Sequence, residues 1–267
     1  MGISQKRDAK RKYHRIAGKS TMGNGNSRHE LEHSIERLRH YASGAEMIFT
    51  NAKALYDEAQ LLGQAGHFAR ATVLHQISME ECSKIDTLGV AATSILVGHN
   101  VDEAHLARAF RNHKAKNHAN AYFARITDEE MAARERKDWK ASSEAFKRFQ
   151  EKFHAEVNAI KNAGLYVDFQ DSQFTAPVNS VDEHTAIAFQ CVNAYFLKHC
   201  DNFLRLLRRM VSEPDFYAEL TKNFVGRSEA LRAAKDLDPQ QIQNVLMEEL
   251  LANYVSKMAE RKSNDLS

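Results

Sequence analysis

Residues 51–84 read NAKALYDEAQLLGQAGHFARATVLHQISMEECSK, and this stretch decides the fold. Apolar residues recur every three or four positions before Gly63 and again after Gly66. This is the period of a helix that buries one face, and glycine is the residue that most often follows a helix end. The stretch therefore predicts two helices, over about 31–62 and 67–97, joined by a short turn.

The rest of the chain has the composition of a helical protein. It holds only 3 Pro and 11 Gly among 267 residues, and both residues are unfavourable inside helices. We therefore expect an all-α fold, a bundle of six or seven helices. Further helices are expected over 102–126, 129–162, 182–212, 214–224 and 239–260, and an extended or turning segment over 163–169. One helical domain is expected over residues 29–262, between a basic arm (1–28) and a disordered tail (263–267).

The arm over residues 1–28 differs from the rest in charge. It holds eight Lys and Arg side chains against one acidic residue, Asp8. Its sequence includes GKSTMGNGNS, which lacks the apolar residues that a core requires, so we expect the arm to be disordered. Such an arm either adds nonspecific affinity for RNA or is only a solvated tail.

Cysteine usage and hydropathy bound the cellular setting. Cys82, Cys191 and Cys200 form no C-x-x-C pair, which favours reduced thiols over a disulfide framework or a zinc ribbon. No apolar run is long enough to span a bilayer, and no signal-peptide pattern is present. We therefore expect a soluble, cytoplasmic protein without a membrane partner. The net charge of +2 does not by itself indicate a nucleic-acid partner.

Residues 107–118, ARAFRNHKAKNH, concentrate basic and histidine side chains. Histidine can exchange a proton with a ribose hydroxyl near neutral pH, and arginine can hold the phosphate, so the run suits RNA transesterification. Arg108 and His113 are five residues apart and lie on different faces of a regular helix, whereas Arg111 and His118 are seven apart and lie on nearly the same face. A solvated helix face is the alternative. The candidate side chains are Arg108 with His113, Arg111 with His118, and the lysines Lys114 and Lys116.

A second group of charged residues lies in SMEECSK, residues 78–84. Glu80 and Lys84 have the i,i+4 spacing of a helical ion pair. The spacing of the neighbouring apolar residues instead turns Glu81 towards the core. A buried carboxylate is costly unless a cation or a hydrogen-bond donor faces it. We therefore expect Glu81 to pair with Arg108 or Lys84, and the alternative is a surface salt bridge.

Two Glu-x-x-His spacings match those of di-iron helical bundles. They are Glu30 with His33 and Glu151 with His154. Ligands of that kind must project into the bundle, whereas the first pair lies at a helix start and the second on the flank of an apolar face. A di-iron bundle is kept as a third hypothesis, and no metal or other cofactor is predicted.

Three segments together resemble a known family. They are residues 51–84, FRNHKAKNH at 110–118 and GLYVDF at 164–169, and the chain resembles the bacterial AbiV-type abortive-infection proteins of the HEPN superfamily from about residue 45 to 210. Phe110, His113 and Lys116 match the family's Phe-x-x-His-x-x-Lys block. The resemblance implies a phage-defence protein with a HEPN-like helical bundle. Many HEPN proteins are metal-independent endoribonucleases that act as homodimers.

The resemblance also assigns roles to residues. It implies that Arg108 and His113 form the catalytic pair of the Arg-x4–6-His motif, with Glu81 and Lys84 orienting them. Arg111 and His118 fit the same spacing and remain an alternative register. The expected partners are a second copy of the chain, RNA, and a phage-encoded activator or host partner that releases the activity. The rival function is a non-catalytic HEPN protein that acts by binding a partner.

Overall fold

The computed structural model describes residues 27–123, 126–235, 242, 245–246 and 249. Nearly all of the predicted arm (1–28), the predicted last helix (239–260) and the predicted tail (263–267) lie outside these residues. Within the described part the all-α prediction is confirmed, because a single two-stranded hairpin interrupts a series of helices. No helix among the described residues is long and apolar enough to cross a membrane.

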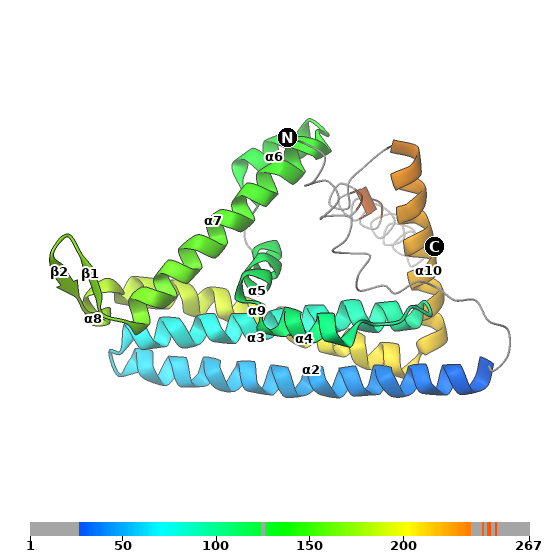
Figure 1. Ribbon diagram of the computed structural model, residues 1–267, viewed down its shortest axis with the longest axis horizontal. Helices are drawn as coiled ribbons and strands as arrows, with labels where there is room; N and C mark the ends of the chain where they lie inside the picture. The colour runs from blue at the N-terminus through cyan, green and yellow to red at the C-terminus, as the bar shows by residue number, and fades with distance from the viewer. Residues whose placement is uncertain (1–26, 124–125, 236–241, 243–244, 247–248, 250–267) are drawn as a thin grey trace, which may run out of the picture. The chain divides into compact units, whose positions relative to one another are not determined.

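The helices run in chain order from α2 to α10 (Figure 1). They are α2 (Ser27–Gln64), α3 (Phe68–Leu96), α4 (Glu103–Arg111), α5 (His113–Asn120), α6 (Asp128–Glu135), α7 (Trp139–Leu165), α8 (Pro177–Ser180), α9 (Glu183–Ser212) and α10 (Pro214–Lys235). A 3-10 turn, η1 (Ala121–Phe123), follows α5, and the strands are β1 (Asp168–Gln170) and β2 (Gln173–Thr175).

The chain divides into two compact units. The first combines residues up to Ala124 with Gln150–Ala218, and the second combines Arg125–Phe149 with the residues from Glu219 onward. Because α7 and α10 each have residues in both units, the expected single domain over residues 29–262 stays a prediction. Every site residue singled out by the sequence lies in the first unit.

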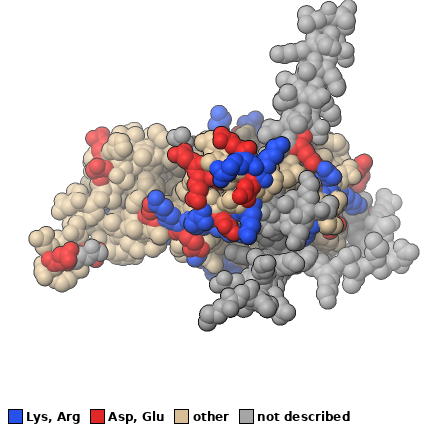
Figure 2. All heavy atoms as spheres, turned by 90° about the horizontal axis from the view of Figure 1, so that it is seen from above, with Lys and Arg blue, Asp and Glu red and all other residues tan. Residues whose placement is uncertain are grey.

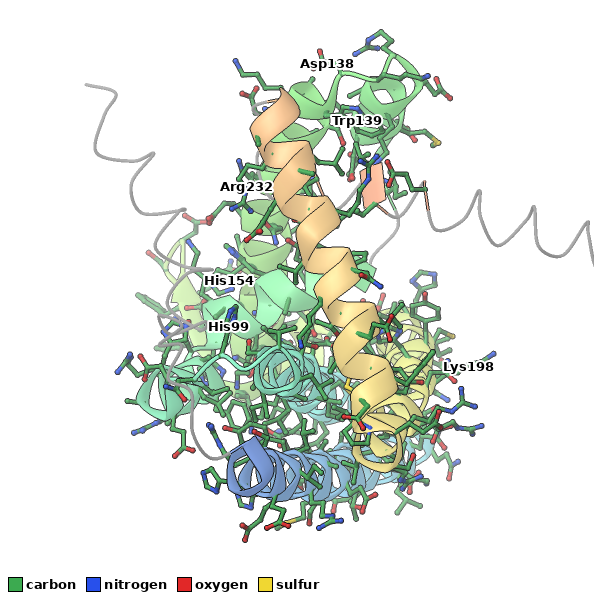
Figure 3. All side chains as sticks on the ribbon, turned by 90° about the vertical axis from the view of Figure 1, so that its right-hand side faces the viewer. His99, Asp138, Trp139, His154, Lys198 and Arg232 are labelled. Atoms are coloured by element: carbon green, nitrogen blue, oxygen red, sulfur yellow. The ribbon has the colours of Figure 1, made fainter. Side chains whose placement is uncertain are left out.

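Three long helices, α2, α3 and α9, form the core of the first unit. They lie side by side in Figure 1 and are seen end-on in Figure 3. α2 contributes Ala45, Ala52 and Ala59, all 0% exposed and seven residues apart, and these small side chains allow the backbones to approach closely. α3 is buried on several sides, because α5 covers it as well as α2 and α9.

The turn between α2 and α3 forms where the glycines predict it. Gly66 adopts φ 78°, in the left-handed region that favours glycine, and α3 begins two residues later. The two helix ends beside the turn, Gln64 and Phe68, lie within two residues of the predicted positions. The sequence therefore locates this turn correctly, and the turn sets α3 antiparallel to α2.

Two predicted helices are each broken in the structure. The expected helix over 102–126 stops at Asn112, whose φ of −89° and ψ of 100° leave the helical region while its side chain accepts a hydrogen bond from the Ala115 amide. The expected helix over 129–162 stops before Lys137, which has a positive φ of 55°. Conversely, the expected short helix over 214–224 continues to Lys235.

The predicted extended segment (163–169) is a strand only at its end, because α7 continues to Leu165 and only Asp168 and Phe169 lie in the first strand of a β-hairpin. β1 and β2 pair antiparallel with Phe169 opposite Phe174, and the two rings lie 4.6 Å apart between centroids. Asp171 and Ser172 at the tip both have positive φ, as a tight two-residue hairpin turn requires. The hairpin lies at the end of the first unit where α2 turns into α3 (Figure 1).

The described part of the second unit contains α6 and the adjoining parts of α7 and α10. Arg148 on α7 pairs with Glu129 on α6, and Thr127 caps α6 by accepting a hydrogen bond from the Glu130 amide. A small apolar cluster is formed by Leu231, Ile242 and Leu246.

Candidate active site

A single buried carboxylate, that of Glu80 on α3, organises the candidate site. Its side chain is only 3% exposed. One oxygen, Oε2, lies 2.5 Å from Nδ1 of His113 and 3.0 Å from Nζ of Lys116. The other oxygen, Oε1, accepts a hydrogen bond from Nζ of Lys161 at 3.1 Å. Three helices, α3, α5 and α7, therefore meet at one carboxylate.

The electrostatics of Glu80 favour its ionised form. Burial raises the pKa of its carboxyl, but the hydrogen bonds from Lys116, His113 and Lys161 outweigh burial and hold the pKa below its ordinary value. An ionised carboxylate can only accept hydrogen bonds, so His113 carries its hydrogen on Nδ1. In the neutral ring Nε2 is then the atom that can take up a proton.

The helix break at Asn112 brings His113 to this carboxylate. Because Asn112 caps α5, His113 is the first residue of a new helix, and Lys116 follows three residues later on the same face. The His113 side chain is 61% exposed, whereas that of Lys116 is only 10% exposed. The ring is thus anchored on its Nδ1 side and open to solvent elsewhere.

The sequence interpretation of the two neighbouring glutamates needs correction. The apolar spacing turns Glu81 towards the core, but the fully buried acid is Glu80. Glu81 has the partner Lys84 rather than Arg108, and it also accepts a hydrogen bond from Asn51 on α2 at 3.2 Å. The expected pair of Glu80 with Lys84 is not formed, because Lys84 is bound to Glu81.

Lys84 extends the site towards α4. Its Nζ lies 5.8 Å from the ring centroid of Phe110, which is within the range of a cation–π contact. Phe110 in turn packs against the core of α2, α3 and α9. This contact holds the C-terminal end of α4 against α3, next to the point where the chain turns into α5.

The two candidate arginines lie on exposed parts of α4. Arg108 is 63% exposed and its Nη2 lies 3.8 Å from Oδ2 of Asp102. Arg111 donates a hydrogen bond from Nε to the carbonyl of Ala107 at 3.2 Å. Because the helix ends at Arg111, the seven-residue spacing that would put Arg111 and His118 on one face no longer applies.

The other face of α5 contacts α7 instead of Glu80. Nε2 of His118 lies 3.7 Å from Oε1 of Glu151, and Lys114 pairs with Oε2 of the same residue at 2.8 Å. The Lys114 hydrogen bond is the main cause that lowers the pKa of Glu151. Gln150 donates a hydrogen bond to the His118 carbonyl at 2.9 Å. α5 thus presents His113 and Lys116 on one side, and Lys114 and His118 on the other.

The Glu151–His154 spacing does not assemble a metal site in the described residues. His154, labelled on α7 in Figure 3, accepts a hydrogen bond at Nδ1 from the Asn117 amide at 3.1 Å. Its ring lies 6.0 Å from that of His118. No three His, Cys, Asp or Glu side chains in this part of the chain lie where they could hold a metal ion. His33 is exposed, and the side chain of Glu30 lies outside the described residues.

Lys161 belongs to the site although no sequence motif indicates it. It lies 81 residues from Glu80 along the chain, and nothing in its local sequence distinguishes it from other lysines of α7. The one signal is Gly164, one turn later. A Cβ at Gly164 would lie 2.7 Å from Cγ2 of Val73 and 3.0 Å from the Ala69 carbonyl oxygen, so glycine permits the close approach of α7 to α3.

Charge on one face of the described residues is mixed rather than basic. On the face shown in Figure 2, Lys and Arg side chains lie among Asp and Glu side chains and form no continuous basic surface there. On α7, for example, Lys152 lies 3.7 Å from Glu156 one turn away.

Comparison with known proteins places these residues in a wider context. The HEPN family model described as AbiV matches residues 40–198, which is more than half of the chain and includes every residue of the site. An uncharacterised protein of Sinorhizobium fredii, y4gJ, is 34% identical over 109 residues, which cover 41% of this chain and 57% of that protein. No solved structure matches the chain.

Proposed function

The chain belongs to the AbiV family of HEPN proteins, and we propose that it is a phage-defence protein that cleaves cellular RNA as a metal-independent endoribonuclease. The observation that carries the proposal is the pairing of Glu80 with His113. A buried carboxylate fixes one nitrogen of an exposed imidazole and leaves the other available for proton transfer. Such an orienting carboxylate is a recurrent partner of catalytic histidines.

In the proposed reaction Nε2 of His113 takes the proton from a ribose 2′-hydroxyl. The 2′-oxygen forms a bond to phosphorus and the bond from phosphorus to the 5′-oxygen breaks, which yields a 2′,3′-cyclic phosphate. The departing 5′-oxygen takes up a proton, which the imidazolium of His113 can return. A positioned proton-transfer group is typically worth about 10²–10⁴ in rate.

Arg108 is the proposed phosphate clamp. Its guanidinium is exposed and its contact with Asp102 is long, at 3.8 Å, so a phosphate can compete for it. The register Arg108 with His113 is preferred over Arg111 with His118, because the His118 side chain is only 20% exposed and faces Glu151. The His113 ring, by contrast, is open to solvent and is held in its orientation by Glu80.

The wider setting follows from the family. We propose that the chain acts in the cytoplasm as a homodimer, and that it is held inactive until a phage-encoded activator or host partner releases it, because unregulated RNA cleavage would block translation and growth. Light scattering, which measures the oligomeric state, would test the homodimer. Growth of cells after induction of the chain would test separately whether it is held inactive.

The experiment that tests the nuclease is cleavage of total cellular RNA in EDTA. Wild type is compared with His113→Ala and Arg108→Ala, and with His118→Ala and Arg111→Ala as matched variants of the other register. We expect cleavage to survive EDTA and to fall at least about 10²-fold in the first two variants only. Loss in the second pair alone would move the site to the other register. Absence of cleavage by wild type, even with extract from phage-infected cells, would refute the nuclease.

One observation favours a second candidate function, binding of a partner without catalysis. The hairpin exposes a pair of aromatic rings, with Phe169 57% and Phe174 78% exposed. Aromatic side chains are enriched where proteins bind one another. Under this alternative His113→Ala keeps the growth phenotype, whereas replacing both rings by Ser abolishes it.

A further inference from the structure

Two ammonium groups share the one buried carboxylate of the site. Lys116 Nζ lies 3.0 Å from Oε2 of Glu80 and Lys161 Nζ lies 3.1 Å from Oε1. The Lys116 side chain is 10% exposed and that of Lys161 is 14% exposed, so both are largely shielded from solvent. Among the described residues Glu80 is the carboxylate that pairs with either of them. The neighbouring Glu81 is matched by Lys84 and does not offset the second charge.

The cluster therefore carries an excess positive charge. One carboxylate balances one ammonium, so Glu80, Lys116 and Lys161 together have a charge of +1 even when the ring of His113 is neutral. A buried charge without a counter-ion is unfavourable. Each ammonium also has three N–H donors, of which Glu80 uses one. The cluster has both the charge and the donors to bind an anion.

The position of this charge identifies the anion. His113 and Lys116 contact the same oxygen of Glu80, so an anion bound by the lysines lies beside the imidazole. We propose that Lys116 and Lys161 form a phosphate-binding subsite that holds a phosphodiester group of RNA next to His113. This rests on the proposed function, and it adds Lys161 of α7, which no motif of the sequence indicates, to the residues that contact substrate.

Binding of an RNA that cannot be cleaved tests the subsite separately from catalysis. The probe is a fluorescent oligonucleotide with 2′-O-methyl groups throughout, titrated with the full chain at several salt concentrations. Lys161→Gln is compared with Lys152→Gln, an exposed lysine of the same helix whose side chain is 73% exposed. We expect Lys161→Gln to weaken binding about tenfold or more and to lower the slope of log affinity against log salt by about 0.7, the value for one phosphate contact on a single strand.

Lys152→Gln should leave both quantities close to those of wild type. Lys161→Arg keeps the charge and should keep the salt slope, which distinguishes loss of a phosphate contact from a disturbed fold. If Lys161→Gln bound the probe with the same affinity and the same salt slope as wild type, the proposed subsite would be overturned. Failure of wild type to bind the probe would also overturn it. If inorganic phosphate at constant ionic strength displaced the probe at low millimolar concentration, the site would bind free phosphate instead of RNA, and the proposal would fall.

The outcomes for the subsite and for the nuclease are separable. Binding that depends on Lys161 in a chain that never cleaves RNA would keep the subsite and refute the nuclease. Cleavage that depends on His113, together with RNA binding that does not change in Lys161→Gln, would support the nuclease and refute the subsite.

Discussion

Replacing Glu80 by Gln keeps the volume of the side chain and removes its charge. The carboxylate is 3% exposed and faces the imidazole of His113 at 2.5 Å and two ammonium groups, those of Lys116 and Lys161, at 3.0 and 3.1 Å. Removing one partner of a buried ion pair costs about 3–5 kcal/mol, because the other partner stays buried without compensation. Here two lysines lose their counter-ion at once, so we expect a loss of about 4–5 kcal/mol, which lowers the melting temperature on the order of 10 °C.

The measurement is unfolding followed by circular dichroism at a series of pH values. The pKa of Glu80 lies below its ordinary value of 4.5, so its contribution is fully present above about pH 4.5 and is lost as pH falls through the lower value in the folded chain. The difference in unfolding free energy between wild type and Glu80→Gln should therefore be constant from pH 7.5 to 5 and narrow below that.

Glu156→Gln is the matched control on the surface. Glu156 is 60% exposed and pairs with Lys152 at 3.7 Å, so its loss should change stability by less than about 0.5 kcal/mol. A cost of Glu80→Gln no larger than that of Glu156→Gln would show that the buried charge of Glu80 does not stabilise the fold. The same would follow if the cost of Glu80→Gln stayed undiminished at a pH that protonates Glu80 in the folded wild type.

Three further predictions concern the core. Burial raises the pKa of Asp86 from 3.8 to about 7, so the free energy of unfolding should fall as pH rises from about 4 to 7. Asp86→Asn should remove this pH dependence and stabilise the chain by roughly 2–4 kcal/mol at pH 8. Urea titrations at each pH measure both effects. A Cβ at Gly89 would lie 2.2 Å from Cε1 of Phe203, so Gly89→Ala should cost about 1–3 kcal/mol, whereas Gly226→Ala, with open space around it, should be neutral or stabilising by up to about 1 kcal/mol in the same assay. The amide of Gln76 is fully buried and has no hydrogen-bond partner among the described residues, so Gln76→Met should raise the melting temperature, and a lower value would show that the amide is satisfied in solution.

Much of the fold could be predicted from the spacing of apolar residues. This works best for α2 and α9, which are covered on one side and so carry a single apolar stripe. It fails for the helix breaks at Asn112 and Lys137, because each depends on one residue. Asn is an ordinary residue in the middle of a polar helix face as well as a common cap, and local spacing does not separate the two.

The error over Glu80 and Glu81 has a different cause. The spacing of Ile77, Ile85 and Leu88 identifies the side of α3 that faces the core, and it turns Glu81 towards that side. α3 is also covered by α5, so it has a second buried side, and Glu80 lies there. A helix buried on several sides has no single stripe from which the orientation of an acidic residue can be predicted.

The candidate site could be predicted only as far as its local motifs reach. His113 and Lys116 lie on one short helix, so a single short stretch of sequence contains both. Lys161 comes from α7, and its approach to Glu80 depends on how two distant helices pack. That packing depends in part on Gly164, a residue without a functional group.

The approach of α7 to α3 at Gly164 has a consequence for how well this chain tolerates mutation. The distance between the two backbones there is set by the absence of a side chain, and Lys161 stands on the same helix one turn earlier. A methyl group at position 164 would act as a spacer, and it would withdraw the ammonium from Glu80 without changing any charged residue. The proposed chemistry at His113 therefore depends on a residue that does not contact Glu80 and whose contribution is the absence of a side chain.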